Sequence, residues 1–382
     1  MGSAGLFALS EAEALAFASK HGTPCFAYRL GIARERFDAL RAALPRRAVL
    51  AYAVKANPGP RLLDAFAAKG ASFDCASMGE LELARGASIP GDRVLLAGPG
   101  KSDDELRLAH AMGARIQADG IEDFSRLDAM AGAAGASVNL RIQPGSGPSA
   151  FGVDEEELTP FLKEAARFPR VRIAGAQVFA ASNERSAERL LANHRIAFSI
   201  AERLQAESGS TLDCIDLGGG LGIPYAEGEE ELDIERLGSG LGALLEANTW
   251  FSGKVVVEPG RWLAGPCGVY LARVVRTKSS RGERFAVLEG GINHLLRPLL
   301  TGQSFPVVAP RASGVRAAAT TTVATALAGP LCTSLDRLGS ALLPPLEAGD
   351  LIMFGQAGAY GATEAMTGFL SHPAATEHWL VD

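Results

Sequence analysis

Lys55 has the residue type and the setting for covalent chemistry. It lies in Ala51–Pro58 (AYAVKANP), at the end of an apolar, strand-like run that leads into a Pro-Gly-Pro turn. An apolar setting destabilises a lysine ammonium, and the neutral amine can form a Schiff base with an aldehyde. Most lysines only solvate a surface, so the interpretation depends on the segments that come after Lys55 in the chain.

Two later turns could hold the rest of an aldehyde cofactor. Successive glycines in Asp216–Gly222 (DLGGGLG) would let backbone N–H groups approach a phosphate. In Glu258–Arg261 (EPGR) the carboxylate could pair with a protonated pyridine nitrogen, which keeps the ring an electron sink, while Gly260 and Arg261 add phosphate contacts. Each segment alone is also compatible with an ordinary turn. Together with Lys55 they point to pyridoxal phosphate (PLP).

The elements that must position these residues alternate between β-like runs and helical stretches rich in Ala, Leu, Glu and Arg. Eight strands separated by helices predict a (β/α)8 barrel, with a doubly wound open sheet as the alternative. The expected strands are 49–54, 72–75, 94–97, 114–118, 137–142, 173–179, 214–217 and 254–257. The expected helices include 60–69, 78–85, 103–111, 122–131, 155–166 and 187–207.

The residue composition and pattern change after about residue 265. Segments 269–277, 284–288, 315–326 and 350–354 are rich in β-branched residues, with weak helix signals. We therefore expect a PLP-binding barrel at 30–265 and a β-rich domain at 266–382, completed by residues 1–29 with a strand at 24–30. In a barrel, active groups come from the carboxyl ends of strands. Lys55, Asp74, Arg141, Ser182 and Glu258 all fall at such positions, as do residues 218–220.

Composition excludes several other classes of protein. The net charge of -6 argues against a nucleic-acid partner. No apolar run reaches the roughly 18 residues of a membrane helix, and the first residues do not resemble a signal peptide, so a cytoplasmic protein is expected. The five scattered cysteines predict neither a disulfide framework nor a metal site.

The chain resembles the fold-type III PLP-dependent decarboxylases, the family of the ornithine, diaminopimelate and arginine decarboxylases. The resemblance covers about residues 22–373 and rests on many short segments in family order. They are Tyr52–Asn57 (YAVKAN), Phe73–Glu80 (FDCASMGE), Arg141–Pro144 (RIQP), Ser149–Gly152 (SAFG), Asp216–Gly220 (DLGGG), Glu258–Arg261 (EPGR), Gly290–Asn293 (GGIN), Arg297–Pro298, Gly329–Cys332 (GPLC) and Gly358–Tyr360 (GAY).

The resemblance implies a role for each matching residue. Lys55 would form the Schiff base with PLP, Glu258 would hold the pyridine nitrogen, and Asp74 and Arg141 would orient Lys55 and the ring. Cys332 would be a proton donor that reaches the site from the second subunit of a homodimer. The phosphate would be bound by Ser182, Gly219, Gly220, Gly260, Arg261 and Tyr360. Arg297, Thr333, Asp336 and His372 are the predicted substrate contacts.

Three departures from the family pattern bear on the reaction. Phe179 replaces a histidine that stacks on the PLP ring; it can stack but cannot donate a proton. Thr333 follows Cys332 where the family carries an acid that pairs with a distal ammonium. Leaving that ammonium unpaired in a desolvated pocket would cost on the order of several kcal/mol. The combination of Cys332–Asp336 (CTSLD) with Gly368–Pro373 (GFLSHP) resembles a branch that acts on conjugated amino acids.

The expected function is therefore α-decarboxylation of a citryl-type conjugate of an amino acid in carboxylate siderophore assembly. The alternatives are a carrier-protein-bound aminoacyl group and a free diamino acid such as diaminopimelate, ornithine or lysine. From other classes, a non-catalytic PLP-binding homologue is opposed by the presence of Lys55, Glu258 and Cys332. An amino-acid racemase is opposed by Glu258 where the family racemases carry an arginine.

Overall fold

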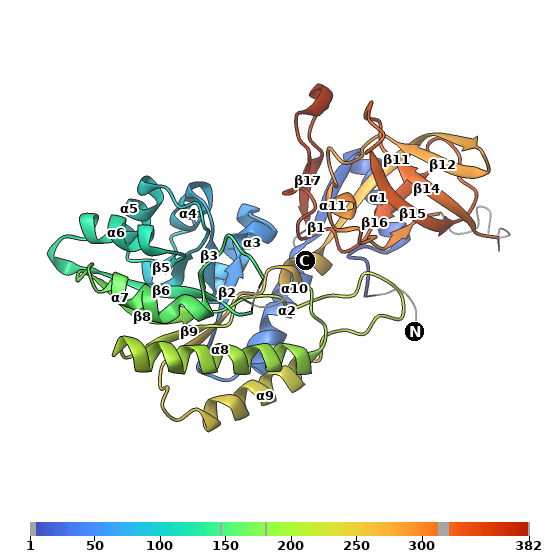
Figure 1. Cartoon of the computed structure of the whole chain (residues 1–382). Helices are drawn as coiled ribbons and strands as arrows, with labels where there is room; N and C mark the ends of the chain where they lie inside the picture. The colour runs from blue at the N-terminus through green and yellow to red at the C-terminus, as the bar shows by residue number, and fades with distance from the viewer. Residues whose placement is uncertain (1–4, 146, 180–181, 312–320, 381–382) are drawn as a thin grey trace. The chain divides into compact units, whose positions relative to one another are not determined.

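The structure, a computed structural model, describes residues 5–145, 147–179, 182–311 and 321–380. The chain divides into two compact units. One comprises residues 36–222 and 231–260, and the other residues 1–35, 223–230 and 261–382. Each unit has its own sheet (Figure 1). The bounds expected from the sequence, 30–265 for the barrel and 1–29 plus 266–382 for the second domain, stay a prediction.

Eight parallel strands of the first unit close into a barrel. The sheet runs in the order β5-β4-β3-β2-β10-β9-β8-β6, and pairing of β5 with β6 joins its two ends. The closed ring confirms the predicted barrel and excludes the open sheet. The strands are β2 (Ala48–Ala53), β3 (Ser72–Cys75), β4 (Val94–Leu96), β5 (Arg115–Ala118), β6 (Ala136–Gln143), β8 (Val171–Gln177), β9 (Cys214–Asp216) and β10 (Lys254–Val257), and a short β7 (Val153–Asp154) pairs with β6.

These strands are nearly continuous apolar runs because both faces of a parallel barrel are buried. All four residues of β3 are buried, and β10 (KVVV) exposes only its first residue. The bounds expected for these two strands agree with the structure, and the other six differ by one or two residues at an end. Phe179 was expected to end a strand, but β8 stops at Gln177.

Helices connect the barrel strands. They are α2 (Leu30–Ala43), α3 (Pro60–Ala68), α4 (Met78–Gly86), α5 (Asp103–Met112), α6 (Ile121–Met130), α7 (Leu158–Ala165), α8 (Ala187–Ser208) and α9 (Ile234–Ala247). Helix α5 begins where Ser102 and Glu105 form a reciprocal capping box and ends at Gly113 in the left-handed conformation. Short 3-10 helices lie at η1 (Val54–Ala56), η2 (Gly91–Arg93), η3 (Gly132–Ala134) and η4 (Glu155–Glu157).

The second unit is built on a mixed sheet. Its main path is β13-β16-β11-β12-β14-β15, and β1 joins β11 to β17. Most neighbours are antiparallel, but β1 is parallel to β17 and β12 is parallel to β14. The strands are β1 (Cys25–Arg29), β11 (Gly268–Ser280), β12 (Glu283–Leu288), β13 (Val307–Val308), β14 (Val323–Ala328), β15 (Arg337–Leu343), β16 (Leu351–Phe354) and β17 (Thr376–Leu380); the helices are α1 (Glu11–His21), α10 (Arg261–Ala264), α11 (Arg297–Thr301), η5 (Gly265–Cys267) and η6 (Phe369–Ser371).

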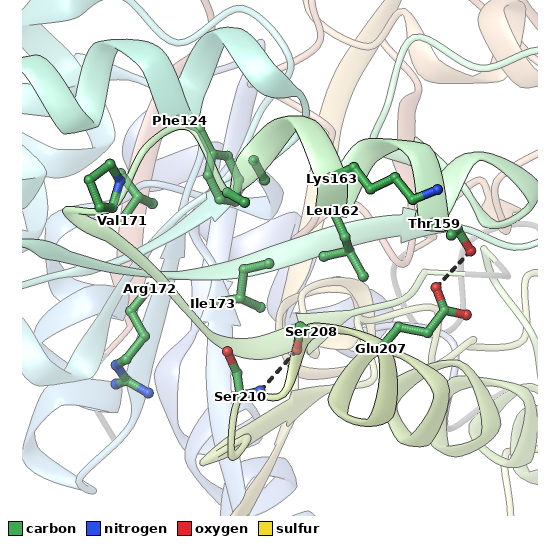
Figure 2. Close-up of a pocket in the computed structure, with 13 residues that line it drawn as sticks. Phe124, Thr159, Leu162, Lys163, Val171, Arg172, Ile173, Glu207, Ser208 and Ser210 are labelled. Atoms are coloured by element: carbon green, nitrogen blue, oxygen red, sulfur yellow. Dashed lines mark hydrogen bonds between the residues drawn. The ribbon is translucent and has the colours of Figure 1, made fainter.

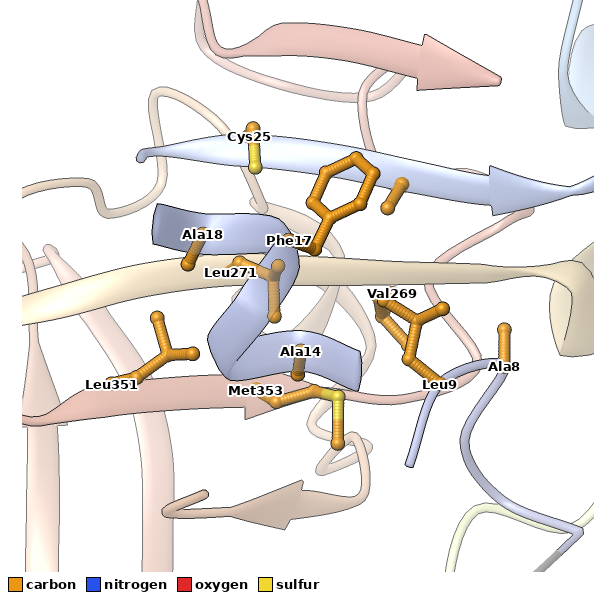
Figure 3. Packing of buried hydrophobic residues seen from close by; sticks show 11 residues of the cluster. Ala8, Leu9, Ala14, Phe17, Ala18, Cys25, Val269, Leu271, Leu351 and Met353 are labelled. Atoms are coloured by element: carbon orange, nitrogen blue, oxygen red, sulfur yellow. The ribbon is translucent and has the colours of Figure 1, made fainter. Parts of the chain in front are cut away.

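The N-terminal segment completes this sheet, as the sequence predicted. Phe17 of α1 packs with Cys25 of β1, Val269 and Leu271 of β11, and Met353 of β16 in one buried cluster (Figure 3). The strands β15 and β17 were not among those expected. The expected strand at 315–326 lies partly outside the described residues, and its described part begins at Val323.

No helix within the described ranges is long and apolar enough to cross a membrane.

Candidate active site

Lys55 lies directly after β2, on the short helix η1. Its Nζ is 3.4 Å from Oδ2 of Asp74, which is buried on β3. The Lys55 side chain is 51% exposed, so its amine can be reached from solvent. Oδ1 of Asp74 is buried and has no hydrogen-bond partner among the residues that the structure describes. A buried carboxylate oxygen of this kind can accept a hydrogen bond from a bound ligand or a water molecule.

Glu258 lies at the carboxyl end of β10, where its carboxyl group meets a second acid. Asp216, the last residue of β9, hydrogen-bonds the Glu258 carboxyl group. Gln117 on β5 donates from Nε2 to both acids, at 2.8 Å to Oδ2 of Asp216 and 3.0 Å to Oε1 of Glu258. The backbone N–H of Gly218 donates to Oδ1 of Asp216 at 2.9 Å. Three strands therefore contribute to one buried acid pair.

Burial raises the pKa of both acids. The pKa of Glu258 lies well above its usual range because the group is desolvated and close to Asp216 and Asp74, and the nearby Lys55 only partly offsets this. Desolvation likewise raises the pKa of Asp216 to about 7, although the N–H of Gly218 favours its ionised form. In the protein without cofactor, this environment favours the protonated form of Glu258.

The glycine run after β9 folds as a turn that only glycines permit. Gly218 and Gly220 adopt left-handed backbone angles, with φ of 65° and 93°. A Cβ on Gly219 would lie 2.4 Å from the backbone oxygen of Glu258. A Cβ on Gly260 would lie 2.9 Å from the Cβ of Ala56. These close approaches keep the glycine turn, the end of β10 and the Lys55 segment packed together.

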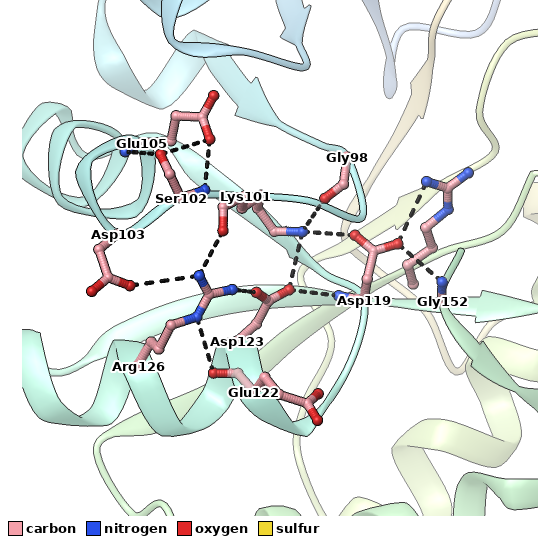
Figure 4. A network of polar contacts seen from close by, with 11 residues as sticks. Gly98, Lys101, Ser102, Asp103, Glu105, Asp119, Glu122, Asp123, Arg126 and Gly152 are labelled. Carbon is pink, nitrogen blue, oxygen red and sulfur yellow. Dashed lines mark hydrogen bonds and ion pairs between the residues drawn. The ribbon is translucent and has the colours of Figure 1, made fainter. Parts of the chain in front are cut away.

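Arg141 is held at the carboxyl end of β6 by a charged network. Its Nη1 is 3.6 Å from Oδ1 of Asp119, which also accepts the backbone N–H of Gly152 at 2.9 Å. The buried Lys101 donates to the other Asp119 oxygen at 2.7 Å (Figure 4). The Arg141 guanidinium lies 4.4 Å from the centroid of the Phe151 ring. Arg141 is thus fixed in place, half-buried.

The segment after β8 carries Phe179 and Ser182. The Phe179 ring packs against Gly218, because a Cβ on that glycine would lie 2.9 Å from Cδ2 of the ring. Phe179 is therefore next to the glycine turn, at the place where the family carries a stacking histidine. Ser182 is exposed, and residues 180–181 before it lie outside the described ranges.

In the second unit, Arg261 and Tyr360 form a cationic and aromatic cluster. The buried Arg261 donates to the hydroxyl of Tyr225 at 2.7 Å, and its guanidinium lies 4.9 Å from the Tyr360 ring centroid. The Arg297 guanidinium lies 4.3 Å from the same ring and pairs with Glu364 at 2.5 Å. Tyr360 therefore contacts two guanidinium groups, of which Arg297 pairs with a carboxylate.

Cys332 is exposed on a turn that Asp336 holds in place. Oδ1 of Asp336 accepts the N–H of Ile292 at 2.8 Å, and Oδ2 accepts the N–H of Leu331 at 2.7 Å. A Cβ on Gly291 or on Gly329 would collide with the same carboxylate. Asp336 is thus buried, and both of its carboxylate oxygens accept backbone N–H groups; the substrate contact expected from the sequence stays a prediction. Thr333 is partly exposed.

His372 is partly exposed and precedes Pro373, whose carbonyl oxygen lies 2.9 Å from Nε2 of His294. The buried His294 also contacts the Tyr270 hydroxyl and the Asn293 side chain. His294 therefore anchors the segment that carries His372.

Four polar residues next to the predicted site were not expected from the sequence: Gln117, Asp216, Tyr225 and Glu364. Asp216 begins one of the segments that carry the resemblance, but its side chain was given no role. In the sequence, Gln117 stands out only as a polar residue inside an apolar strand (IQA). Single polar residues of that kind are common, so this pattern does not identify a site residue. These contacts join strands far apart in the sequence, which pattern alone does not pair.

The residues of the barrel unit fit a pyridoxal group. Lys55 can bind its aldehyde, Glu258 can face a ring nitrogen, and the glycine turn can approach a phosphate. Three features support the fit: the Asp74 oxygen without a partner among the described residues, the raised pKa of Glu258, and glycines at which a Cβ would collide with neighbouring residues. Within the second unit, Arg261 carries a positive charge that suits a phosphate, and Tyr360 lies beside it.

A pocket of about 800 Å³ lies elsewhere on the barrel, among α7, the start of β8 and the end of α8 (Figure 2). Leu162, Ile173 and Ser210 are among its lining residues, and none of the predicted site residues lines it. Because it lies at the amino end of β8, it is separate from the carboxyl ends that carry Lys55 and Glu258.

Comparisons with known proteins agree with this chemistry. Residues 30–265 match the family described as pyridoxal-dependent decarboxylase, pyridoxal binding domain. The chain is 33% identical to a diaminopimelate decarboxylase of Deinococcus radiodurans, over 94% of this chain and 90% of that protein. Its fold is similar to that of the diaminopimelate decarboxylase of Helicobacter pylori complexed with L-lysine, with a TM-score of 0.86, 26% identity and coverage of 96% and 94% of the two chains.

Two further relatives differ in the substrate that their names give. One is an L-glutamyl-[BtrI acyl-carrier protein] decarboxylase of Niallia circulans, 28% identical over 97% of this chain and 91% of that protein. The other is a 2-[(L-alanin-3-ylcarbamoyl)methyl]-2-hydroxybutanedioate decarboxylase of Staphylococcus aureus, 26% identical over 93% and 94%. With the matched barrel, the lysine, the acid pair and the glycine turn, these similarities show that the chain belongs to the pyridoxal-dependent decarboxylases of the diaminopimelate and ornithine family and is a PLP-dependent carboxy-lyase.

Proposed function

We propose that this decarboxylase acts on an α-amino acid whose distal group is not a free amine, most specifically a citryl-type conjugate in carboxylate siderophore assembly. One observation carries the proposal. In the segment 329–337, all of which the structure describes, the residue after Cys332 is the neutral Thr333, and both oxygens of Asp336 accept backbone N–H groups. The Cys332 turn therefore offers no carboxylate to a distal ammonium.

The charged side chains near Tyr360 also favour a conjugated substrate over a free diamino acid. Two guanidinium groups, from Arg261 and Arg297, lie against its ring, and Glu364 pairs with the second. A cluster with an excess of positive charge suits anionic groups, first a phosphate and then carboxylates of a substrate. A citryl conjugate carries such carboxylates, whereas a free diamino acid adds a further cation.

The names of two relatives support the conjugate class. The name of the Staphylococcus aureus protein describes a hydroxylated polycarboxylate joined through an amide to carbon 3 of alanine, so that the distal nitrogen is acylated. The name of the Niallia circulans protein describes a glutamyl group on a carrier protein, again without a free distal amine. The carrier-bound group is the second candidate substrate, and a free diamino acid, which the diaminopimelate decarboxylases suggest, is the third.

Each residue of the site would have a separate task. Lys55 would hold the cofactor aldehyde through Nζ, and Asp74 would orient Nζ. PLP supplies an electron sink for the pair of electrons left when carbon dioxide departs. Glu258 would keep the ring nitrogen protonated and the glycine turn would bind the phosphate, for which the family resemblance also assigns Arg261 and Tyr360. The Cys332 thiol returns a proton to the α-carbon.

The test is release of carbon dioxide by the PLP-loaded protein, with Lys55→Ala as the blank. Citryl-diamino acids and citryl-serine are compared with diaminopimelate, ornithine, lysine and glutamate. We expect release from the conjugates alone. Release from a free diamino acid at a comparable rate would show that the protein acts on free diamino acids and would contradict the proposal. No release from any substrate, with no Lys55-dependent visible absorption band, would favour a non-catalytic homologue.

Substitutions of Thr333 test whether this residue selects the substrate by charge. Thr333→Asp restores an acid after Cys332, while Thr333→Val is its uncharged, similarly sized control. We expect Thr333→Asp to raise the rate on a free diamino acid relative to the conjugate, and Thr333→Val to leave that ratio nearly unchanged. An equal change in both variants would show that Thr333 does not select by charge.

A further inference from the structure

The amide of Gln117 joins two acids that lie on different strands. Its Nε2 is 2.8 Å from Oδ2 of Asp216 and 3.0 Å from Oε1 of Glu258, and Gln117 and Asp216 are fully buried. Its Oε1 is buried without a hydrogen-bond partner in the described part of the chain. The amide thus has its donor toward the two acids, as expected if at least one of them is ionised, because a carboxylate only accepts.

In the protein without cofactor, the acid pair favours one proton over two or none near neutral pH. Two adjacent carboxylates in a desolvated site repel each other, and two neutral acids would leave Gln117 and Gly218 as donors with weaker acceptors. Asp216 accepts two strong donors, from Gly218 and Gln117, while Glu258 accepts one of them. Asp216 is therefore the better stabilised carboxylate, and the proton stays on Glu258.

The surrounding charges keep the proton in the pair. Asp74 on β3 adds a negative charge that raises the pKa of both acids, while Lys55 on η1 opposes it at Glu258. Cys214 on β9 is neutral near pH 7, because burial raises the pKa of its thiol to about 12. Gln117 on β5 carries no charge, so its contribution is its two hydrogen bonds.

We propose that Gln117 and Asp216 are positioning residues that control the proton at Glu258. Gln117 stabilises the carboxylate form of Glu258 and so decides that the proton sits on the ring nitrogen rather than on the acid. Asp216 supplies the neighbouring negative charge that retains this proton as the pH rises. The proposal rests on the role proposed for Glu258 and extends it to two residues that touch neither cofactor nor substrate.

The two substitutions should act differently. In Gln117→Met, Glu258 loses a donor to its carboxylate, becomes more basic and keeps the proton for itself. In Asp216→Asn, the neighbouring charge is lost, and the proton leaves at a lower pH. In both variants a single proton is redistributed between an oxygen of Glu258, the ring nitrogen and solvent.

The experiment observes that proton directly. Each protein is loaded with PLP labelled with 15N in the ring, and the nitrogen chemical shift is measured across about pH 6 to 9. In the unsubstituted protein we expect a protonated nitrogen through most of this range. Gln117→Met should move the shift toward the unprotonated value even at the low end. Asp216→Asn should lower the pH of the transition by about one unit, a tenfold loss in proton affinity.

Two controls separate the possible failures. Gln177 on β8 is also buried with an unsatisfied Oε1, but donates no hydrogen bond to either acid among the described residues, so Gln177→Met should leave the nitrogen shift unchanged. Glu258→Gln should abolish nitrogen protonation; if it does not, the role of Glu258 itself is wrong. If Glu258→Gln acts but neither Gln117→Met nor Asp216→Asn does, in proteins that bind PLP, only this inference is overturned.

Discussion

Asp336 ties two loops of the second unit together through the N–H groups of Ile292 and Leu331. An asparagine in its place keeps one acceptor and turns an NH2 group toward the other N–H. We expect Asp336→Asn to lower the free energy of unfolding by about 1–3 kcal/mol, as for a buried donor left unsatisfied. Urea unfolding measures this change.

The matched control is Asp350→Asn. Oδ2 of Asp350 accepts one N–H, from Glu347, in an exposed turn. Its loss should cost much less than the loss of Asp336, because water can replace the bond. Equal effects of the two substitutions would contradict the role given to Asp336 as a buried anchor of the Cys332 turn.

The buried acids make the stability of the cofactor-free protein depend on pH. The folded-state pKa of Asp216 is raised to about 7 and that of Glu258 lies well above its usual range, so the folded protein binds more protons than the unfolded chain. The contribution of Asp216 to stability is full below about pH 4 and is lost as the pH rises through about 7, and that of Glu258 is lost in the same direction. We therefore expect thermal scans of the apoprotein to show a loss that begins above about pH 4.

His194 gives the stability of the folded protein a pH dependence of the opposite sign over part of this range. Burial lowers its pKa to about 4, so its contribution is lost as the pH falls below about 6.5. The comparison is therefore made with Asp216→Asn, which retains His194. The difference in melting temperature between this variant and the unsubstituted protein should shift in favour of the variant as the pH rises. A difference that is constant with pH would contradict the raised pKa of Asp216.

At the scale of elements, helix α9 forms although it contains three glycines. A Cβ on Gly238 would lie 1.9 Å from the backbone oxygen of Ala43 at the end of α2, and one on Gly240 would lie 2.3 Å from Cδ1 of Leu191 on α8. These two glycines let α9 approach its neighbours closely. Packing therefore compensates for the low helix propensity of glycine.

The glycines of α9 provide a matched pair of substitutions. At Gly242 a Cβ would meet only Pro45, at 3.8 Å, so Gly242→Ala should stabilise the protein by up to about 1 kcal/mol. Gly238→Ala should destabilise it by about 1–3 kcal/mol, because the backbone of α2 must shift. Chemical denaturation of both variants measures the two changes. Stabilisation by both alanines would show that α9 does not pack as closely as the structure has it.

At the scale of the whole molecule, we expect a homodimer with shared active sites. Cys332 is exposed, and the second unit exposes several large apolar side chains: Leu299, Leu300, Leu335, Phe369 and Leu370. Apolar exposure of this kind is typical of a surface that another chain covers. We propose that Cys332 serves the Lys55 of the second subunit. Sedimentation equilibrium should then give twice the mass of the chain.

Mixing two inactive variants tests the sharing of sites. Lys55→Ala and Cys332→Ala should each lose activity as homodimers. After subunit exchange, half of the dimers are mixed and each restores one complete site, so about a quarter of the activity should return. Dimers that exchange subunits without recovering activity would show that Cys332 serves the Lys55 of its own chain.

The sequence by itself predicted the barrel, a separate β-rich domain and the residues proposed to hold the cofactor. Apolar runs of strand length, alternating with helical segments, predict eight strands, because a strand buried on both faces must be apolar throughout. Lys55, the glycine run and Glu258 could be recognised because each lies in a short contiguous segment. The N-terminal strand was likewise visible as a local apolar run.

Only the tertiary structure decided which side chains meet across strands. Gln117 lies between Asp216 and Glu258, although these residues lie on three strands far apart in the sequence. The structural role of Asp336 depends on backbone groups of a distant loop, and α9 depends on the close approach of α2 and α8. These features were not predicted because hydrogen bonding and packing between distant segments arise only when the barrel closes.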